Sequence, residues 1–256
     1  MNLTPEHVES LFRHHEANNS FETLIEQCYS NVLQPGDAAV DGGAHVGMHT
    51  LPMAALVGNR GAVFAYEPIP SLADTVVYNC RHLPQVHVFN AALAARNGRT
   101  KFHLLSEEPW LSGIARRFEN TDKPVTVIEV ATLALDELAT QPIRFIKLDL
   151  EGGEYHAVRG ACSLLAAQQP IIALECGRAD AAASGGYSST QYFAMFEEVG
   201  YQLCDLFGQP FLPEHFQRPW NDRTVPHYIV AMPANNQSIA PMLERNALAL
   251  IASSRS

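Results

Sequence analysis

The chain has 256 residues, of which 47% are hydrophobic and 17% are charged. This balance is typical of a folded protein with a substantial core and excludes an intrinsically disordered chain. Lysine and arginine number 17 against 27 aspartates and glutamates, which gives a net charge of −10. Because no cluster of basic residues is present, we do not expect binding to nucleic acid or to an anionic membrane surface.

The five cysteines are scattered and show no C-x-x-C spacing, so neither a disulfide framework nor a zinc knuckle is expected. The stretch MNLTPEHVES is polar and acidic, unlike a signal peptide. No window approaches 18 uninterrupted apolar residues, the length typical of a membrane span. The sequence therefore predicts a cytoplasmic protein with free thiols and no membrane segment.

The first part of the chain predicts alternating helices and strands. A helix is expected over about 5–31, then a Pro-Gly turn and a short strand that ends at Asp41. A helix over 46–56 follows, with Pro52 in its first turn or at a kink. The strand GAVFAYEP, a helix over about 71–82 and the strand VHVFN complete a β-α-β-α-β pattern. This pattern favours a parallel, doubly wound sheet.

From residue 98 to residue 130 the pattern changes. TKFHLLS and VTVIEV alternate like strands and predict an inserted hairpin or flap. The alternation of strands and helices then resumes with the strand IRFIKLDL, a helix over 154–167, the strand PIIALEC and a helix over 189–199. YQLCDLF and HYIVAMP are expected to close the sheet as an antiparallel pair, which gives seven sheet strands apart from the insertion.

The turn in VDGGAHVGMHT is compatible with two classes of cofactor. A dinucleotide site uses G-x-G-x-x-G, but Ala44 replaces the middle glycine and the Asp41 carboxylate would repel a pyrophosphate. S-adenosylmethionine has no phosphate; its ammonium group suits Asp41, directly or through water, and its carboxylate suits the turn amides. The alternative is a tight turn whose acid only caps the next helix.

Two further strand ends carry candidate cofactor residues. Glu67, twenty residues after Gly47, is predicted to accept both ribose hydroxyls, a role that would serve either class of cofactor. Asn90 and Ala91 are expected beside the adenine ring, because ligands bind across the carboxyl ends of parallel strands. The alternative for Asn90 is an asparagine that satisfies the hydrogen bonds of a turn.

The stretch FIKLDLEGGEYHAVRGA forms a second constellation. Strand alternation places Lys147, Asp149 and Glu151 on one side. Asp149 and Glu151 are candidates to accept a proton from a substrate hydroxyl, to orient it, or to bind a divalent metal. In the alternative reading Lys147 neutralises Asp149, and Glu154 only favours the start of a helix.

Other side chains extend the set of candidates. His45, His49 and His156 lie in or beside the two motifs and are candidates for a general base. The histidines are not spaced as metal ligands, so no metal site is predicted, although a divalent metal remains possible at the acids. Aromatic residues are candidates for a surface that stacks on the substrate, or for core or dimer contacts: Phe102, Trp110, Phe118, Phe211, Phe216 and Trp220.

Taken together, these motifs resemble the FkbM family of S-adenosylmethionine-dependent methyltransferases. The resemblance rests on VDGGAHVG, AYEP, TLALDEL, FIKLDLEGGEYHAVRGA and IIALE in that order, and it covers about 35–177. It implies an α/β, Rossmann-like class I methyltransferase fold, with a seven-stranded, mostly parallel sheet, helices on both faces and an inserted β-hairpin or flap. It also implies O-methylation of a hydroxyl on a sugar, glycoconjugate or polyketide-type natural product.

The resemblance assigns roles by position. We expect cofactor contacts from Asp41, Gly43, Ala44, His45, Gly47, Glu67, Pro68, Asn90, Ala91 and Asp149, and catalytic roles for Asp149, Glu151 and His156. The chain departs from the family pattern at His45, where asparagine is frequent, and in carrying His156 after the acidic motif.

The expected organisation is an N-terminal helical segment over 1–34, a methyltransferase domain over 35–235 and a C-terminal helical tail over 236–256. The partner would be a small hydroxyl-bearing acceptor, and the protein a monomer or homodimer. Two alternatives are a non-catalytic scaffold that binds S-adenosylmethionine and an NAD-dependent reductase or epimerase. The second lacks the Tyr-x-x-x-Lys pair that short-chain reductases need.

Overall fold

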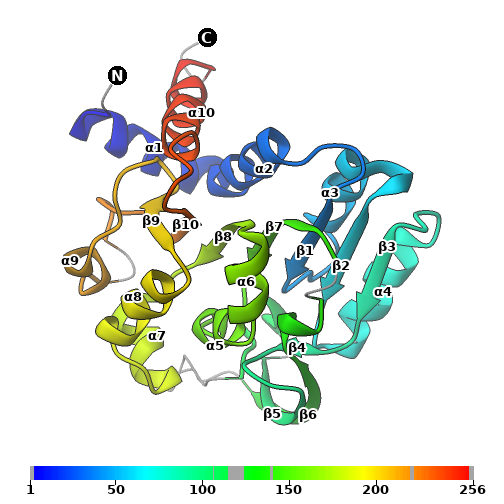
Figure 1. Cartoon of the computed structure of the whole chain (residues 1–256). Coiled ribbons are helices and arrows are strands. Elements are labelled where there is room, and N and C mark those ends of the chain that lie inside the picture. The colour runs from blue at the N-terminus through cyan, green and yellow to red at the C-terminus, as the bar shows by residue number, and fades with distance from the viewer. Residues whose placement is uncertain (1–2, 106, 115–123, 139–140, 220–221, 254–256) are drawn as a thin grey trace.

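A seven-stranded sheet forms the centre of the protein, in the order β3-β2-β1-β7-β8-β10-β9 (Figure 1). The computed structural model describes residues 3–105, 107–114, 124–138, 141–219 and 222–253. Neighbouring strands from β3 to β8 are parallel, whereas β10 is antiparallel to both β8 and β9. The prediction of a mostly parallel sheet closed by an antiparallel pair is confirmed.

The sheet strands are short and largely buried, and their side chains alternate between the two faces. Ala39 and Val63 pack in one core cluster, whereas Val40 and Phe64 pack in the other. The strands are β1 (Ala38–Gly42), β2 (Ala62–Tyr66), β3 (Val86–Phe89), β7 (Ile143–Leu148), β8 (Ile171–Glu175), β9 (Tyr201–Asp205) and β10 (Tyr228–Pro233).

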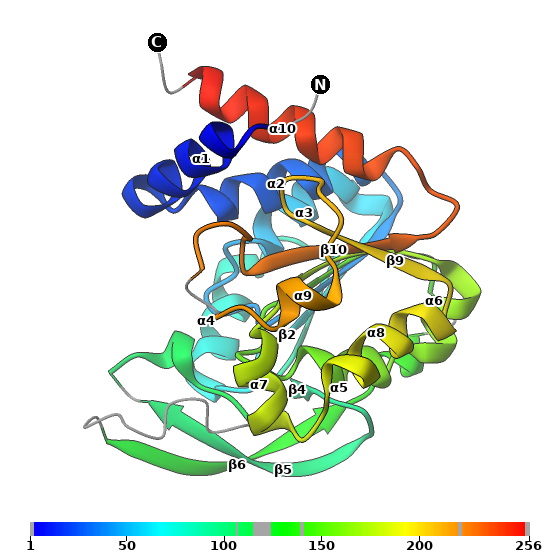
Figure 2. The ribbon, with the colours of Figure 1, turned by 90° about the vertical axis from the view of Figure 1, so that its left-hand side faces the viewer.

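Helices cover both faces of this sheet, as Figure 2 shows from the side. One face carries α1 (Pro5–Asn18), α2 (Ser20–Val32), α3 (Thr50–Val57) and α10 (Ile239–Ser253). The other carries α5 (Glu154–Arg159), α6 (Cys162–Gln168) and α8 (Ser189–Glu198). Three further helices are α4 (Pro70–Cys80), α7 (Arg178–Gly185) and α9 (Pro213–Phe216), of which α7 and α9 were not predicted.

The end segments pack onto the sheet. Residues of α1, α2 and α10 share one core cluster with β-strand residues such as Phe145 and Val230. The boundaries of the three expected segments stay a prediction. Among the helices of the described residues, none is both long and apolar enough to cross a membrane.

Two helices predicted as continuous are interrupted. The first breaks at Asn19, which adopts a left-handed φ of 51° and donates its backbone N–H to the carbonyl of His15. Asparagine tolerates this conformation better than most residues. The second breaks at Gly160, where a Cβ atom would lie 2.2 Å from the carbonyl oxygen of Ala94. The helix predicted over 46–56 begins later, at Thr50, so Pro52 falls in its first turn.

The insertion forms a separate three-stranded sheet. β5 (Gly98–Leu105) and β6 (Val125–Leu133) are antiparallel, and the two-residue strand β4 (Ala92–Leu93) pairs in parallel with β6. The inserted hairpin is therefore confirmed, while β4 was too short to be predicted. Phe102 and Val130 of this sheet pack against Ile69, which follows β2.

Candidate active site

A cavity of about 450 Å³ lies at the carboxyl ends of the central strands. This volume is in the range of small-molecule sites, about 300–1,000 Å³. The predicted cofactor and catalytic residues that line it are Gly43, Ala44, His45, His49, Glu67, Pro68, Ala91, Asp149 and Glu151. The predicted residues that the structure places outside its lining are Asp41, Gly47, Asn90 and His156.

The glycine turn packs tightly against the end of β7. Gly43 has a φ of +74°, and a Cβ atom on it would lie 1.9 Å from the carbonyl oxygen of Asp149. The amides of Gly43 and Ala44 both donate to the carbonyl of Tyr66 at 3.0 Å. Because these amides are bonded within the protein, they fix the turn to the end of β2. Binding of the cofactor carboxylate by the turn amides stays a prediction.

His45 also adopts a left-handed conformation, with a φ of 52°. Asparagine is enriched in this region of φ/ψ space, so an asparagine at this position would meet the same backbone requirement. The amide of His45 donates to Oε2 of Glu67 at 2.9 Å. Burial, with a smaller contribution from Lys147, lowers the pKa of the His45 imidazole, which is therefore neutral at neutral pH.

Glu67 follows β2 and is 4% exposed. Its Oε1 accepts the amide of Ile69 at 2.9 Å and its Oε2 accepts the amide of His45 at 2.9 Å. Burial outweighs these hydrogen bonds and raises the pKa of Glu67 to about 7. Each carboxylate oxygen can accept a second hydrogen bond. The side chain is thus held rigidly at the cavity wall with acceptor capacity left for a ligand.

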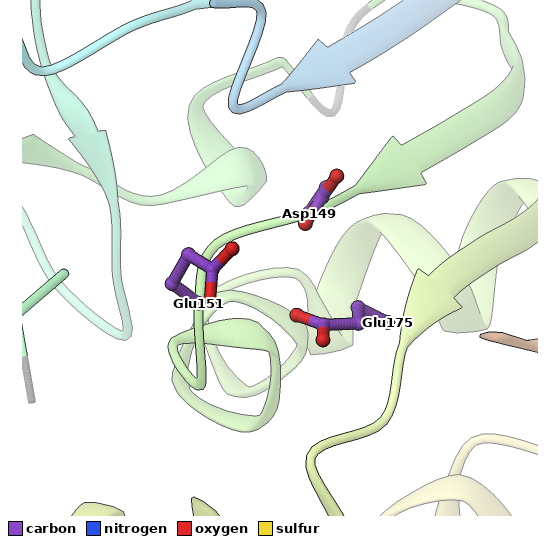
Figure 3. Close-up of side chains that lie close together, drawn as sticks. All are labelled: Asp149, Glu151 and Glu175. Carbon is purple, nitrogen blue, oxygen red and sulfur yellow. The ribbon is translucent and has the colours of Figure 1, made fainter. Parts of the chain in front are cut away.

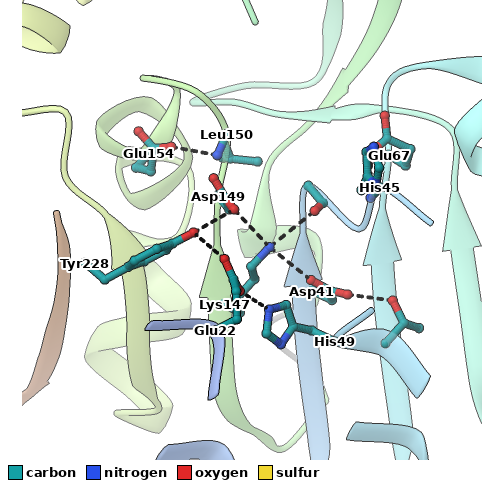
Figure 4. Close-up of polar contacts among 12 residues, drawn as sticks. Glu22, Asp41, His45, His49, Glu67, Lys147, Asp149, Leu150, Glu154 and Tyr228 are labelled. Atoms are coloured by element: carbon teal, nitrogen blue, oxygen red, sulfur yellow. Dashed lines mark hydrogen bonds and ion pairs between the residues drawn. The ribbon is translucent and has the colours of Figure 1, made fainter. Parts of the chain in front are cut away.

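A buried charge network lies behind the turn (Figure 4). Lys147 is 3% exposed. Its Nζ is 3.7 Å from Oδ1 of Asp41 and 3.6 Å from Oδ2 of Asp149. Thr50 donates its hydroxyl to Oδ2 of Asp41 at 2.6 Å. Asp41, which is 0% exposed, therefore contacts Lys147 and Thr50 rather than the cavity.

The network keeps both Lys147 and Asp149 charged. Burial alone would lower the pKa of Lys147, but Asp149 and Asp41 outweigh it and raise that pKa. Burial alone would raise the pKa of Asp149, but Lys147 and the hydroxyl of Tyr228 hold it below its usual value. The neutralisation of Asp149 by Lys147 that the sequence offered as an alternative is thus present. Glu154, in turn, accepts the amide of Leu150 at 2.6 Å, a structural role in the turn before α5.

Three carboxylates meet on one side of the cavity (Figure 3). Oxygen atoms of Asp149, Glu151 and Glu175 all lie within 4.8 Å of one another. Such a group can accept hydrogen bonds from hydroxyls or hold a divalent cation. Glu175 was not predicted as a site residue, although its place at the end of β8, beside β7, was a usable signal.

Other lining residues come from distant parts of the chain. Tyr228, which begins β10, donates its hydroxyl to Oδ2 of Asp149 at 2.9 Å, and Oε1 of Glu22 lies 3.4 Å from the same hydroxyl oxygen. Nε2 of His49 lies 2.7 Å from Oε2 of Glu22, which is on α2. Burial, followed by His15, lowers the pKa of His227 to about 4. No sequence motif marks Glu22 or Tyr228; only the fold brings them together.

His156 and Asn90 both make hydrogen bonds with backbone carbonyl groups. Nε2 of His156 lies 2.8 Å from the carbonyl oxygen of Gly185, and the residue lines a second cavity of about 460 Å³. Asn90 donates to the carbonyls of Glu67 and Pro68 at 2.9 and 3.1 Å, as expected for an asparagine that satisfies a turn.

The insertion supplies an apolar wall to the cavity. Phe102, Trp110 and Ile114 line it, and Trp110 is 56% exposed. Phe118 and Trp220 lie outside the described residues. Phe211 and Phe216 are buried in the core cluster that contains Val40 and Phe64. Of the aromatic residues predicted to contact the substrate, only Phe102 and Trp110 of the insertion line the cavity among the described residues.

The sheet order, the cavity at the carboxyl ends of the strands, the glycine turn and the strand-end acids together define a Rossmann-like class I methyltransferase. The family model described as the methyltransferase FkbM domain matches residues 41–203. The chain belongs to this FkbM methyltransferase family, and its cofactor is S-adenosylmethionine.

The solved structures that resemble this chain have low sequence identity to it. The FkbM methyltransferase of Methylobacillus flagellatus is 15% identical with a TM-score of 0.48, and the match covers 80% of this chain but 49% of that one. The S-adenosylmethionine-dependent O-methyltransferase of Thermotoga maritima is 16% identical with a TM-score of 0.44, over 86% and 67% of the two chains. A putative methyltransferase of Streptococcus mutans in complex with S-adenosylhomocysteine is 11% identical with a TM-score of 0.46, over 82% and 95%. No curated protein matches the chain.

Proposed function

We propose that this protein is an O-methyltransferase that acts on a hydroxyl of a sugar, glycoconjugate or polyketide-type natural product. The observation that carries the proposal is the group of Asp149, Glu151 and Glu175, whose oxygens lie within 4.8 Å of one another at the cavity. Carboxylates are hydrogen-bond acceptors and proton acceptors, which is what a hydroxyl nucleophile requires.

The cavity fits S-adenosylmethionine on chemical grounds. Glu67 is rigidly held and has acceptor capacity for the two ribose hydroxyls. Ile69, Ala91 and Leu93 line the same part of the cavity and offer an apolar surface for the adenine ring. We propose that Gly43, Ala44, His45 and Pro68 complete the cofactor contacts, and that Asp41, Gly47 and Asn90 support them from behind the lining.

When bound, S-adenosylmethionine supplies a sulfonium-bound methyl group to a nucleophilic oxygen. We propose that Asp149 orients the acceptor hydroxyl, because its lowered pKa makes it a good hydrogen-bond acceptor and a weak base at neutral pH. Glu151, on the adjoining turn, receives the proton. Orientation can contribute about 7–11 kcal/mol to a reaction of this kind, and a positioned base about 10²–10⁴-fold. His156 lines the second cavity rather than the first, so we do not assign it a part in this step.

Asp149→Asn is expected to lower turnover about 10²-fold or more while changing affinity for S-adenosylhomocysteine less than about threefold. The change removes the charge that orients the hydroxyl and leaves a side chain of the same shape. Steady-state kinetics combined with calorimetry measures both quantities. An equal loss of turnover and cofactor affinity, or no loss of either, would remove Asp149 from the proposed role.

The acceptor is expected to be a small molecule with an apolar or ring-shaped part that contacts the wall formed by Phe102, Trp110 and Ile114. We propose a cytoplasmic location, supported by the five cysteines, all of which are free. We further propose that the protein acts as a monomer or homodimer.

Methyl-labelled S-adenosylmethionine offered with a panel of sugars and hydroxylated natural products tests the proposal. Mass spectrometry should find the label as an ether on a hydroxyl oxygen of at least one acceptor class. Label found only on nitrogen, sulfur or carbon would contradict O-methylation. Repeating the reaction with EDTA decides whether a divalent cation takes part at the three carboxylates.

A further inference from the structure

Asp41 cannot be the direct partner of the cofactor ammonium group in this structure. Its carboxylate is 0% exposed, with Oδ2 bonded to the hydroxyl of Thr50 and Oδ1 facing the ammonium of Lys147. Lys147 also donates to the carbonyl of Gly43 at 3.3 Å, so the charged pair lies behind the glycine turn. A second cation at Asp41 would have to displace Lys147 from a buried site, which costs several kcal/mol.

In the cofactor position proposed above, Glu67 holds the ribose and the adenine ring lies over Ile69 and Ala91. The amino acid part would then lie toward the ends of β1, β7 and β10. Near those strand ends the cavity is lined by the carboxylates of Glu22, Asp149, Glu151 and Glu175. Glu151 and Glu175 belong to the group proposed above for the acceptor hydroxyl, which leaves Asp149 and Glu22 as candidates for the ammonium group. Asp149 is already paired with Lys147 and accepts the hydroxyl of Tyr228.

Glu22 reaches this position from α2, outside the range 41–203 that matches the family model. Its side chain is 27% exposed and lines the cavity. Contacts with His49 at 2.7 Å and with the hydroxyl of Tyr228 at 3.4 Å fix its direction (Figure 4). Carboxylate oxygens have room for further hydrogen bonds beyond these two.

We propose that the carboxylate of Glu22 receives the α-ammonium group of S-adenosylmethionine. Tyr228 and His49 hold the Glu22 carboxylate in place. The inference rests on the cofactor and on the ribose position given above. Lys147 is shared by Asp41 and Asp149, and Glu22, which contacts His49 and Tyr228, adds a further carboxylate at this end of the cavity. The positively charged ammonium group of the cofactor would offset this excess of carboxylates. Its charge-assisted hydrogen bond to Glu22 would make the contact specific. The N-terminal helices thereby become part of the cofactor site.

Titration calorimetry with two ligands separates this contact from general effects. S-adenosylhomocysteine carries the ammonium group, whereas 5′-methylthioadenosine has the same nucleoside without the amino acid. Glu22→Gln should weaken binding of the first about 10- to 100-fold and change binding of the second less than about twofold. Glu26→Gln is the matched control, because Glu26 is exposed one turn further along the same helix. It should leave both affinities unchanged.

Three results would overturn the inference. Unchanged binding of S-adenosylhomocysteine to Glu22→Gln would place the ammonium on another acid, and Asp149→Asn then identifies it. An equal loss for both ligands would show that Glu22 only supports the shape of the cavity. If the unmodified protein binds neither ligand, the cofactor position fails together with the inference, which distinguishes this case from the other two.

Discussion

Lys147 lies between the carboxylates of Asp41 and Asp149, and this arrangement decides which acids face the cavity. Strand alternation was enough to predict that Lys147, in β7, and Asp149, directly after it, lie on one side. The burial of Asp41 was not predictable, because it depends on the hydroxyl of Thr50, the first residue of α3, and on the path of the Lys147 side chain. The acidic residues at the strand ends thus located the site, but the sequence did not show which of these acids face the cavity.

Glu67 gives a pH dependence that can be measured. Burial raises its pKa to about 7, and only the ionised carboxylate accepts both ribose hydroxyls. Affinity for S-adenosylhomocysteine should therefore rise about tenfold from pH 6 to pH 8 and level off above. Calorimetry at several pH values measures this, with Glu67→Gln as the control that should show weaker and flatter binding. The same pH dependence in both proteins would assign the titration to another group.

The helices and strands were largely predictable, because buried parallel strands appear as short apolar runs and amphipathic helices show their periodicity. The breaks at Asn19 and Gly160 were not, since each follows from a local backbone conformation or a close tertiary contact. The same holds for β4, whose two residues pair with residues forty positions later in the chain.

The turn after β1 needs a glycine at residue 43 for two reasons, and a matched variant separates them. Gly43→Ala meets both a positive φ and the carbonyl of Asp149 at 1.9 Å, whereas Gly186→Ala meets a left-handed backbone with no atom within 4 Å. Gly186→Ala should cost about 1–2 kcal/mol of unfolding free energy, and Gly43→Ala about 3 kcal/mol or more. Chemical denaturation measures both; equal costs would mean that the close contact with β7 relaxes freely.

The insertion is expected to contact the acceptor rather than the cofactor. Trp110→Ala should raise the KM for the acceptor about tenfold, since an aromatic contact is lost, while affinity for S-adenosylhomocysteine stays within about twofold. Val127→Ala is the control, because Val127 is 52% exposed on β6 of the same sheet and does not line the cavity. A larger effect of Trp110→Ala on cofactor binding than on acceptor KM would contradict this assignment.

At the scale of the whole molecule, the site is assembled from more of the chain than the family match covers. Glu22 of α2 and Tyr228 of β10 both line the cavity, and both lie outside residues 41–203. The same two ends of the chain share a core cluster with the sheet. Sequence motifs find residues that are near one another along the chain, so contributions from residues 22 and 228 became visible only through the folded structure.

Titration calorimetry with S-adenosylhomocysteine and, in parallel, with NAD tests the central claim most directly. The structure and the family predict binding of S-adenosylhomocysteine at micromolar concentrations and none of NAD, because the cavity presents carboxylates and no phosphate-binding turn among its described residues. Binding of NAD alone would contradict the account and favour a reductase or epimerase. If neither ligand binds, the account is contradicted as well, because the protein would then have a methyltransferase fold that does not bind the cofactor.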